Sequence, residues 1–111
     1  MITTFEAALL AHLCADWLLQ NDWMAQHKQQ WRHPAAWVHA GIHALLLGLV
    51  LGWQGGLVLG LLHLWIDTRA PLQWWARRFG KTLTGPLGFH IAIWTDQTLH
   101  IIAITLWIAW R

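Results

Sequence analysis

Histidine and aspartate recur in pairs spaced four residues apart, within segments that are otherwise apolar. This spacing places both side chains of a pair on one face of a helix. Neutral imidazole and carboxylate are ligands for zinc, iron and manganese, and two of them at this spacing can reach a single ion. The pairs, one in each apolar segment, are His12 and Asp16, His39 and His43, His63 and Asp67, and Asp96 and His100.

These eight side chains predict a shared site for divalent metal, with zinc favoured over iron or manganese. An ionisable group in the hydrocarbon region costs at least about 2.5–3.5 kcal/mol, and bound metal would offset that cost. Eight ligands exceed the set that one tetrahedral ion uses. They could hold two ions, or one ion with carboxylates that orient the imidazoles. Asp16 and Asp96 are the candidate general bases, and His90 is a reserve ligand.

Other interpretations of the pairs stay open. The side chains could form a hydrogen-bonded polar seam without metal, a path for protons or ions, or a haem site, although a haem would not need the three aspartates. A full path is disfavoured because the other half of the segments is almost wholly apolar. A di-iron redox site usually uses glutamate, and the only glutamate, Glu6, is badly placed.

Composition indicates the elements that carry these pairs. The chain has 111 residues, of which 57% are hydrophobic and 11% charged, whereas soluble domains have about 25% charged residues. A soluble domain this small could not bury so much apolar surface, although a soluble bundle with a rich core remains the alternative. The sequence therefore predicts one all-α domain over 1–111, a four-helix transmembrane bundle of two antiparallel hairpins. The expected helices are about 5–20, 35–53, 55–70 and 87–110, with a short interfacial helix near 71–80.

Glycines flank the turn WQGG that joins the second and third segments. Gly48, Gly52, Gly56 and Gly60 are spaced by four residues, and small residues at this spacing let helix backbones approach closely in lipid. We therefore expect the second and third helices to touch along this face.

Cationic residues indicate the orientation in the membrane. Of the seven Lys and Arg residues, six lie in two loops that a four-helix topology places on the same side. The positive-inside rule makes that side cytoplasmic and puts both termini outside. We expect a multi-pass protein of the bacterial inner membrane, with membrane lipids as partners and no nucleic acid, and with a homo-oligomer left open.

The same loops could attract an anionic lipid headgroup, although membrane topology explains their charge equally well. The candidates are Arg69, Arg77, Arg78 and Lys81. Together with a metal that activates water, they suggest a hydrolase acting on a lipid or lipid-linked phosphoester at the cytoplasmic leaflet. The chain contains no serine, which excludes a serine nucleophile. The alternative is a non-enzymatic carrier, sensor or scaffold subunit, so enzyme activity is left open.

Four stretches together resemble a known family over nearly the whole chain. They are AHLCADWLLQNDWMAQHK, HAGIHALLLGL, LLHLWIDTR and DQTLHII. This pattern is similar to the bacterial and phage family known only as a domain of unknown function, DUF3307. Its motif adds Gln20, Asp22, Lys28 and Gln97 to the ordered pairs, and Arg69 stands where the pattern leads us to expect lysine. The resemblance implies a small integral membrane protein and no particular activity.

Overall fold

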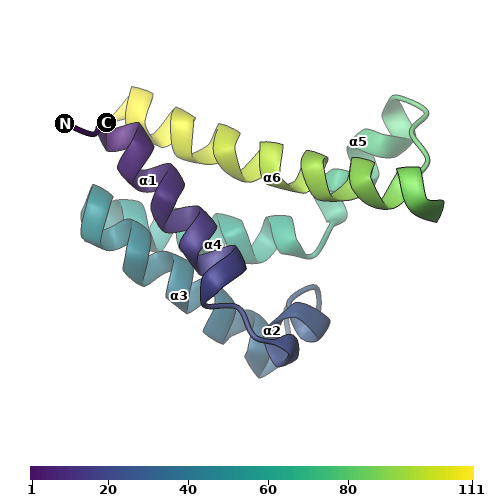
Figure 1. Cartoon of the computed structure of the whole chain (residues 1–111), viewed down its shortest axis with the longest axis horizontal. Coiled ribbons are helices and arrows are strands. Elements are labelled where there is room, and N and C mark those ends of the chain that lie inside the picture. The colour runs from purple at the N-terminus through teal and green to yellow at the C-terminus, as the bar shows by residue number, and fades with distance from the viewer.

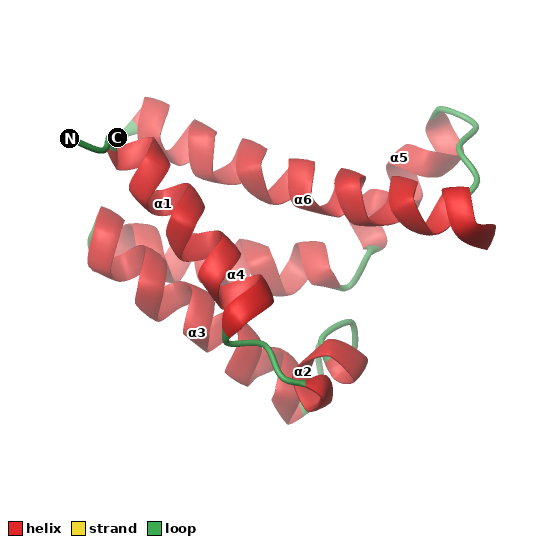
Figure 2. Cartoon of the chain, viewed as in Figure 1, coloured by secondary structure: helices red, strands yellow, loops and turns green.

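The computed structural model describes all 111 residues and contains helices and no strands (Figures 1 and 2). The predicted all-α class is confirmed. The long elements are α1 (Thr4–Leu13), which continues into the π-helical turn η1 (Cys14–Leu18), then α3 (Pro34–Leu51), α4 (Trp53–Asp67) and α6 (Gly85–Trp110). Both termini lie at one end of the molecule, and the short helices α2 (Asp22–His27) and α5 (Ala70–Arg78) lie at the other (Figure 1).

The four predicted segments correspond to α1 with η1, α3, α4 and α6, and α5 is the short helix expected near 71–80. Helix α2 was not predicted. Only α3 and α6 are long and apolar enough to cross a membrane by length and composition. Helix α4 has 15 residues, and α1 and η1 have 10 and 5, which is below the roughly 17 residues of a spanning helix. Whether all four helices cross the membrane therefore stays a prediction.

The first long element starts with a capping box and ends in a widened turn. The Glu6 backbone N–H donates to the Thr3 hydroxyl at 3.1 Å, and the Thr3 N–H donates to the Glu6 carboxylate at 2.7 Å, which satisfies two helix-end donors. Further along, the Leu19 N–H donates to the Cys14 carbonyl at 2.9 Å. This bond spans five residues, as in π-helical turns, which often occur at functional sites. Asp16 lies inside it.

The hairpin of α3 and α4 turns at a single glycine. Gly52 has φ 88°, a region that glycine enters without steric cost, and WQGG forms the first turn of α4. The prediction that WQGG is the turn was therefore wrong. Close packing is present further along, since a Cβ on Gly56 would lie 2.4 Å from the Ala44 carbonyl oxygen. Gly52 makes no such approach and contributes only the turn.

The half of the bundle near the termini has an apolar core. Ala8, Leu47, Leu51, Leu59 and Ile104, drawn from all four long helices, are buried together there. Many large apolar side chains remain on the outside, including Leu49 at 77% and Trp94 at 69% exposure. Such an extensive apolar surface is typical of contact with a membrane or another protein.

Candidate metal centre

All eight predicted ligands are buried in the half of the bundle away from the termini. The i, i+4 spacing gives each of α3, α4 and α6 one inward pair, and α1 with η1 supplies the fourth. The buried acids and imidazoles form eight His–Asp contacts of 2.8–3.9 Å, each through a histidine Nε2. Three of these contacts link residues of one helix, and the others join different helices.

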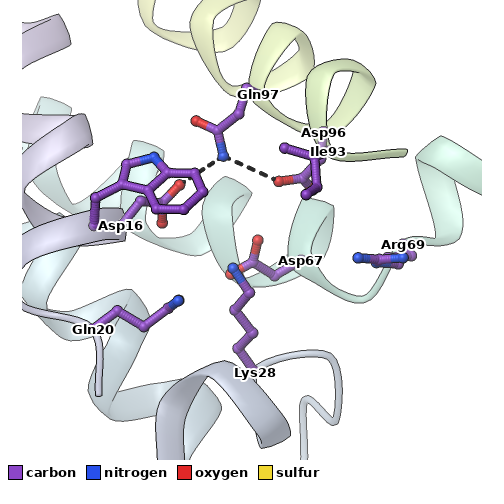
Figure 3. Close-up of a pocket in the computed structure, with 9 residues that line it drawn as sticks. Asp16, Gln20, Lys28, Asp67, Arg69, Ile93, Asp96 and Gln97 are labelled. Carbon is purple, nitrogen blue, oxygen red and sulfur yellow. Dashed lines mark hydrogen bonds between the residues drawn. The ribbon is translucent and has the colours of Figure 1, made fainter. Parts of the chain in front are cut away.

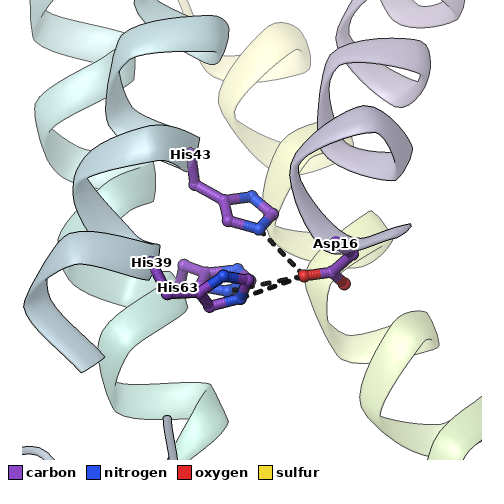
Figure 4. A group of neighbouring side chains, drawn as sticks. All are labelled: Asp16, His39, His43 and His63. Atoms are coloured by element: carbon purple, nitrogen blue, oxygen red, sulfur yellow. Dashed lines mark hydrogen bonds and ion pairs between the residues drawn. The ribbon is translucent and has the colours of Figure 1, made fainter. Parts of the chain in front are cut away.

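Asp16 and three histidines form the first group (Figure 4). Asp16 Oδ1 lies 2.9 Å from His43 Nε2, 3.1 Å from His39 Nε2 and 3.9 Å from His63 Nε2. A tetrahedral zinc ion with bonds of about 2.0–2.1 Å holds its ligand atoms about 3.3–3.4 Å apart. The three distances from Asp16 Oδ1 lie on either side of this separation, and all four ligand atoms are within 4.8 Å of one another, so the group could hold such an ion.

Asp67 connects this group to a second one. Asp67 Oδ2 lies 2.8 Å from His63 Nε2 and 3.4 Å from His39 Nε2. Its other oxygen, Oδ1, lies 3.2 Å from His100 Nε2, which is also 3.6 Å from Asp96 Oδ2. Asp67, Asp96 and His100 form a set of possible ligands, and His12, His63 and His100 form another. Since His63 and His100 are shared, the sets make one continuous polar cluster.

Several atoms of the cluster are close without being hydrogen-bonded. His63 Nε2 and Asp67 Oδ2 are 2.8 Å apart, yet neither atom has a hydrogen-bond partner, and neither does His39 Nε2. Buried polar atoms are nearly always paired in folded proteins. A polar seam would satisfy these atoms by bonds between them. Other contacts of the cluster are hydrogen bonds, including His43 Nε2 with Asp16 Oδ1 at 2.9 Å and His100 Nε2 with Asp67 Oδ1 at 3.2 Å, so the cluster combines a hydrogen-bonded network with atoms that are available to a cation.

Gln97 belongs to the cluster but was not among the eight predicted ligands. Its amide nitrogen donates to Asp16 Oδ2 at 2.9 Å, and its Oε1 lies 2.9 Å from His12 Nε2. Because an amide oxygen only accepts, this hydrogen bond requires a proton on His12 Nε2, and while it is made His12 could not bind a metal through that nitrogen. Gln97 is not part of an i, i+4 pair, so spacing could not reveal it; only the family motif included it.

A cavity of about 160 Å³ opens onto the carboxylates of the cluster (Figure 3). It lies between η1, the loop segments after α2 and α4, and α6. Its walls are formed by Asp16, Trp17, Gln20, Lys28, Asp67, Arg69, Ile93, Asp96 and Gln97. Two cationic side chains, Lys28 and Arg69, thus face the same space as three carboxylates.

The four predicted headgroup contacts do not lie together. Arg69 lines the cavity, whereas Arg77, Arg78 and Lys81 are exposed and do not line it. Lys28, which was not among the four, does line it. The reserve ligand His90 is exposed and lies outside every group of possible ligands.

A model of the protein family described as a protein of unknown function, DUF3307, matches residues 4–110. No curated protein and no solved structure matches the chain. Any function must therefore be inferred from the geometry of the cluster.

Proposed function

The chain belongs to the DUF3307 family, whose function is unknown, and we propose that it is a membrane-embedded metal protein that hydrolyses a lipid or lipid-linked phosphoester. The observation that carries this proposal is the first group of ligands. One oxygen of Asp16 lies 2.9–3.9 Å from three buried imidazole nitrogens of two other helices. Such a set of three nitrogens and one oxygen suits zinc, with iron or manganese as alternatives.

A membrane position is supported by α3, α6 and the exposed apolar side chains. Six cationic residues lie in or beside α2 and α5, at the end of the molecule away from the termini. The positive-inside rule would place this end in the cytoplasm. The cavity that leads to the cluster lies at the same end, so substrate would enter from the cytoplasmic leaflet.

The two candidate bases differ in how fully they are engaged. Asp16 uses Oδ1 toward three imidazoles and accepts from Gln97 through Oδ2, which fits a ligand. Asp96 lines the cavity and has only two longer contacts, 3.5 Å to Gln97 and 3.6 Å to His100. We therefore assign the general base to Asp96.

The proposed reaction needs only water as a co-reactant. The four ligands of the first group would fill a tetrahedral ion, so a divalent ion there would need to accept a fifth ligand in order to polarise a phosphoryl oxygen or favour the ionised form of a water molecule. Asp96 would accept a proton from the attacking water as its oxygen bonds to phosphorus. The phosphorus–oxygen bond to the alcohol breaks, and the leaving alkoxide takes up the proton that Asp96 has accepted, which restores the carboxylate. A second ion held by Asp67, Asp96 and His100 would take Asp96 as a ligand, so the proposed reaction uses one ion.

Elemental analysis of protein purified in detergent without chelator tests the metal. We expect at least one equivalent of a transition metal, and its loss in His43→Ala and Asp16→Asn. His90→Ala is the matched control, since this histidine is exposed and lies outside the cluster. Less than about a tenth of an equivalent, with no thermal stabilisation by added zinc, manganese or ferrous iron, would favour the polar seam.

Hydrolysis is tested separately on micelles that contain phosphoester lipids. We expect metal-dependent release of product that Asp96→Asn reduces by about 10²–10⁴-fold. Stoichiometric metal without any turnover would support the non-enzymatic alternative, a metal carrier, sensor or scaffold subunit.

A further inference from the structure

We propose that Lys28 and Arg69 form a phosphoryl-binding subsite at the mouth of the cavity, and that its ligand is a terminal phosphate group. The inference rests on the proposed function for the metal, and it narrows the phosphoester to a phosphomonoester. Neither residue belongs to the His/Asp cluster, so the subsite can be altered without removing a metal ligand.

Both cations lack a partner although carboxylates share their cavity. All eight ion pairs join a histidine to an aspartate, so neither Lys28 nor Arg69 has a carboxylate oxygen within 4.0 Å. Both side chains are half-buried, and charged groups that leave water are usually paired. Figure 3 shows the Lys28 ammonium extending into the space in front of Asp67. The two charges are thus available to an incoming anion.

Gln20 adds a neutral donor to the same space. Its Oε1 is buried without a hydrogen-bond partner, and its amide nitrogen points into the cavity (Figure 3). An ammonium, a guanidinium and an amide N–H are all donors, as a phosphoryl group with three acceptor oxygens requires.

The backbone at Arg69 supports a role for its side chain. Arg69 is the only residue other than glycine with positive φ, at 66°. It lies in the short connection between α4, which ends at Asp67, and α5, which begins at Ala70. Non-glycine residues in this conformation are uncommon and cost free energy, and they concentrate at functional sites. The guanidinium lines the cavity from this position.

The size and the walls of the cavity limit the ligand. Its volume of about 160 Å³ is below the roughly 300–1,000 Å³ of pockets for drug-sized ligands, and close to the roughly 150 Å³ of a cavity that holds benzene. One phosphoryl group fits this space. Trp17 and Ile93 supply an apolar part of the wall, which suits the start of a hydrocarbon tail. The ligand is therefore a phosphate that terminates an apolar chain.

The carboxylates make anion binding depend on the metal. Asp16, Asp67 and Asp96 line the cavity and repel an anion unless cations offset their charge. We expect phosphate to bind more tightly when the metal centre is loaded.

Calorimetric titration with inorganic phosphate, on the whole 111-residue chain in detergent with and without zinc, tests the subsite. Lys28→Gln and Arg69→Gln should each weaken phosphate binding about 10–100-fold, the loss of one hydrogen bond to a charged group. The matched controls Arg77→Gln and Lys81→Gln, which remove exposed cations outside the cavity, should bind as the unmodified protein does. Metal content should be unchanged in all four variants.

A competition arm distinguishes a lipid from free phosphate. Micelles with phosphatidic acid, which carries a terminal phosphate, should displace inorganic phosphate, and micelles with phosphatidylglycerol, an anionic phosphodiester, should not. Water-soluble glycerol phosphate should compete more weakly than phosphatidic acid.

Three outcomes would overturn the subsite. The first is that the cavity variants and the control variants bind phosphate with equal affinity. The second is that the unmodified protein binds no phosphate, with or without zinc. The third is that phosphatidic acid and phosphatidylglycerol displace phosphate equally. A protein that takes up no metal but loses phosphate binding in Arg69→Gln would refute the metal centre and support the subsite.

Discussion

The same four long helices build two halves with opposite chemistry. Near the termini, Ala8, Leu47 and Ile104 pack in an apolar core, and Gly56 brings the backbones of α3 and α4 together. At the other end, five histidines, three aspartates and Gln97 fill the interior. The apolar half leaves one buried polar atom beside its core, Trp107 Nε1, without a hydrogen bond. The polar half holds buried atoms, such as His39 Nε2 and Asp67 Oδ2, that no hydrogen bond satisfies.

The difference between the halves indicates a division of roles. Packing of apolar side chains stabilises a bundle without specifying a ligand. Buried ionisable groups lower stability unless they are paired or bind an ion. We infer that the apolar half supports a polar half that would be costly alone, so changes in the two halves should have separable effects.

The largest effects should come from truncating the centre of either half. Leu47→Ala should lower the free energy of unfolding by about 2–5 kcal/mol, and Asp16→Ala, which leaves several imidazoles without their carboxylate, by about 3–5 kcal/mol. Only Asp16→Ala should also lose the metal. Thermal unfolding in detergent and elemental analysis would measure both. Loss of metal from folded Leu47→Ala would show that the halves are not independent.

A smaller effect should follow at the helix contact of the apolar half. Gly56→Ala should destabilise by about 1–3 kcal/mol, because its Cβ would lie 2.4 Å from the Ala44 carbonyl oxygen. Gly48→Ala is the matched control, since its Cβ would meet only Gly56 Cα at 3.8 Å and alanine favours a helix. Equal stability of the two variants, by thermal unfolding, would mean that α3 and α4 are further apart.

Gln97 tests how finely the polar half is arranged. Gln97→Leu removes no proposed ligand but leaves Asp16 and His12 without their bridge. Loss of such an orienting partner typically weakens metal affinity about 10–100-fold. Competition with a chelator of known affinity would measure the change. An unaltered affinity would show that the helices alone position Asp16.

The smallest effect should be a gain. Arg69→Gly relieves a left-handed backbone that costs roughly 1–2 kcal/mol, and loses about 0.4–1 kcal/mol through the greater entropy of the unfolded chain. The net change should therefore lie between about 0 and 1.6 kcal/mol in favour of the folded state. Phosphate binding should fall in the same variant. Clear destabilisation on thermal unfolding would show that the arginine side chain stabilises the fold.

Periodicity predicted the features that repeat along a helix. The i, i+4 pairs gave every member of the His/Asp cluster, and the glycine spacing gave the contact at Gly56 and Gly60. Features that depend on a single local conformation were missed or misplaced. The turn at Gly52, the positive φ at Arg69 and the helix α2 are of this kind. Lys28 reaches the cavity only because the connection between η1 and α3 folds over it, which no periodic pattern records.

The hydrogen bond from the Leu19 N–H to the Cys14 carbonyl determines how this segment would respond to the deletion of one residue. A π turn holds one residue more than an α-helical turn, so η1 already contains an extra residue. Removal of Leu18 would let the segment close as an ordinary helix, whereas a deletion within α3 or α6 would rotate all that follows by about 100° without such relief. The shortened chain should fold, but the side chains before and after the deletion would change direction relative to one another. Asp16 could then not face His39 and His43 while Gln20 still faces the cavity. In this segment the number of residues, as well as their chemistry, determines whether the cluster can form.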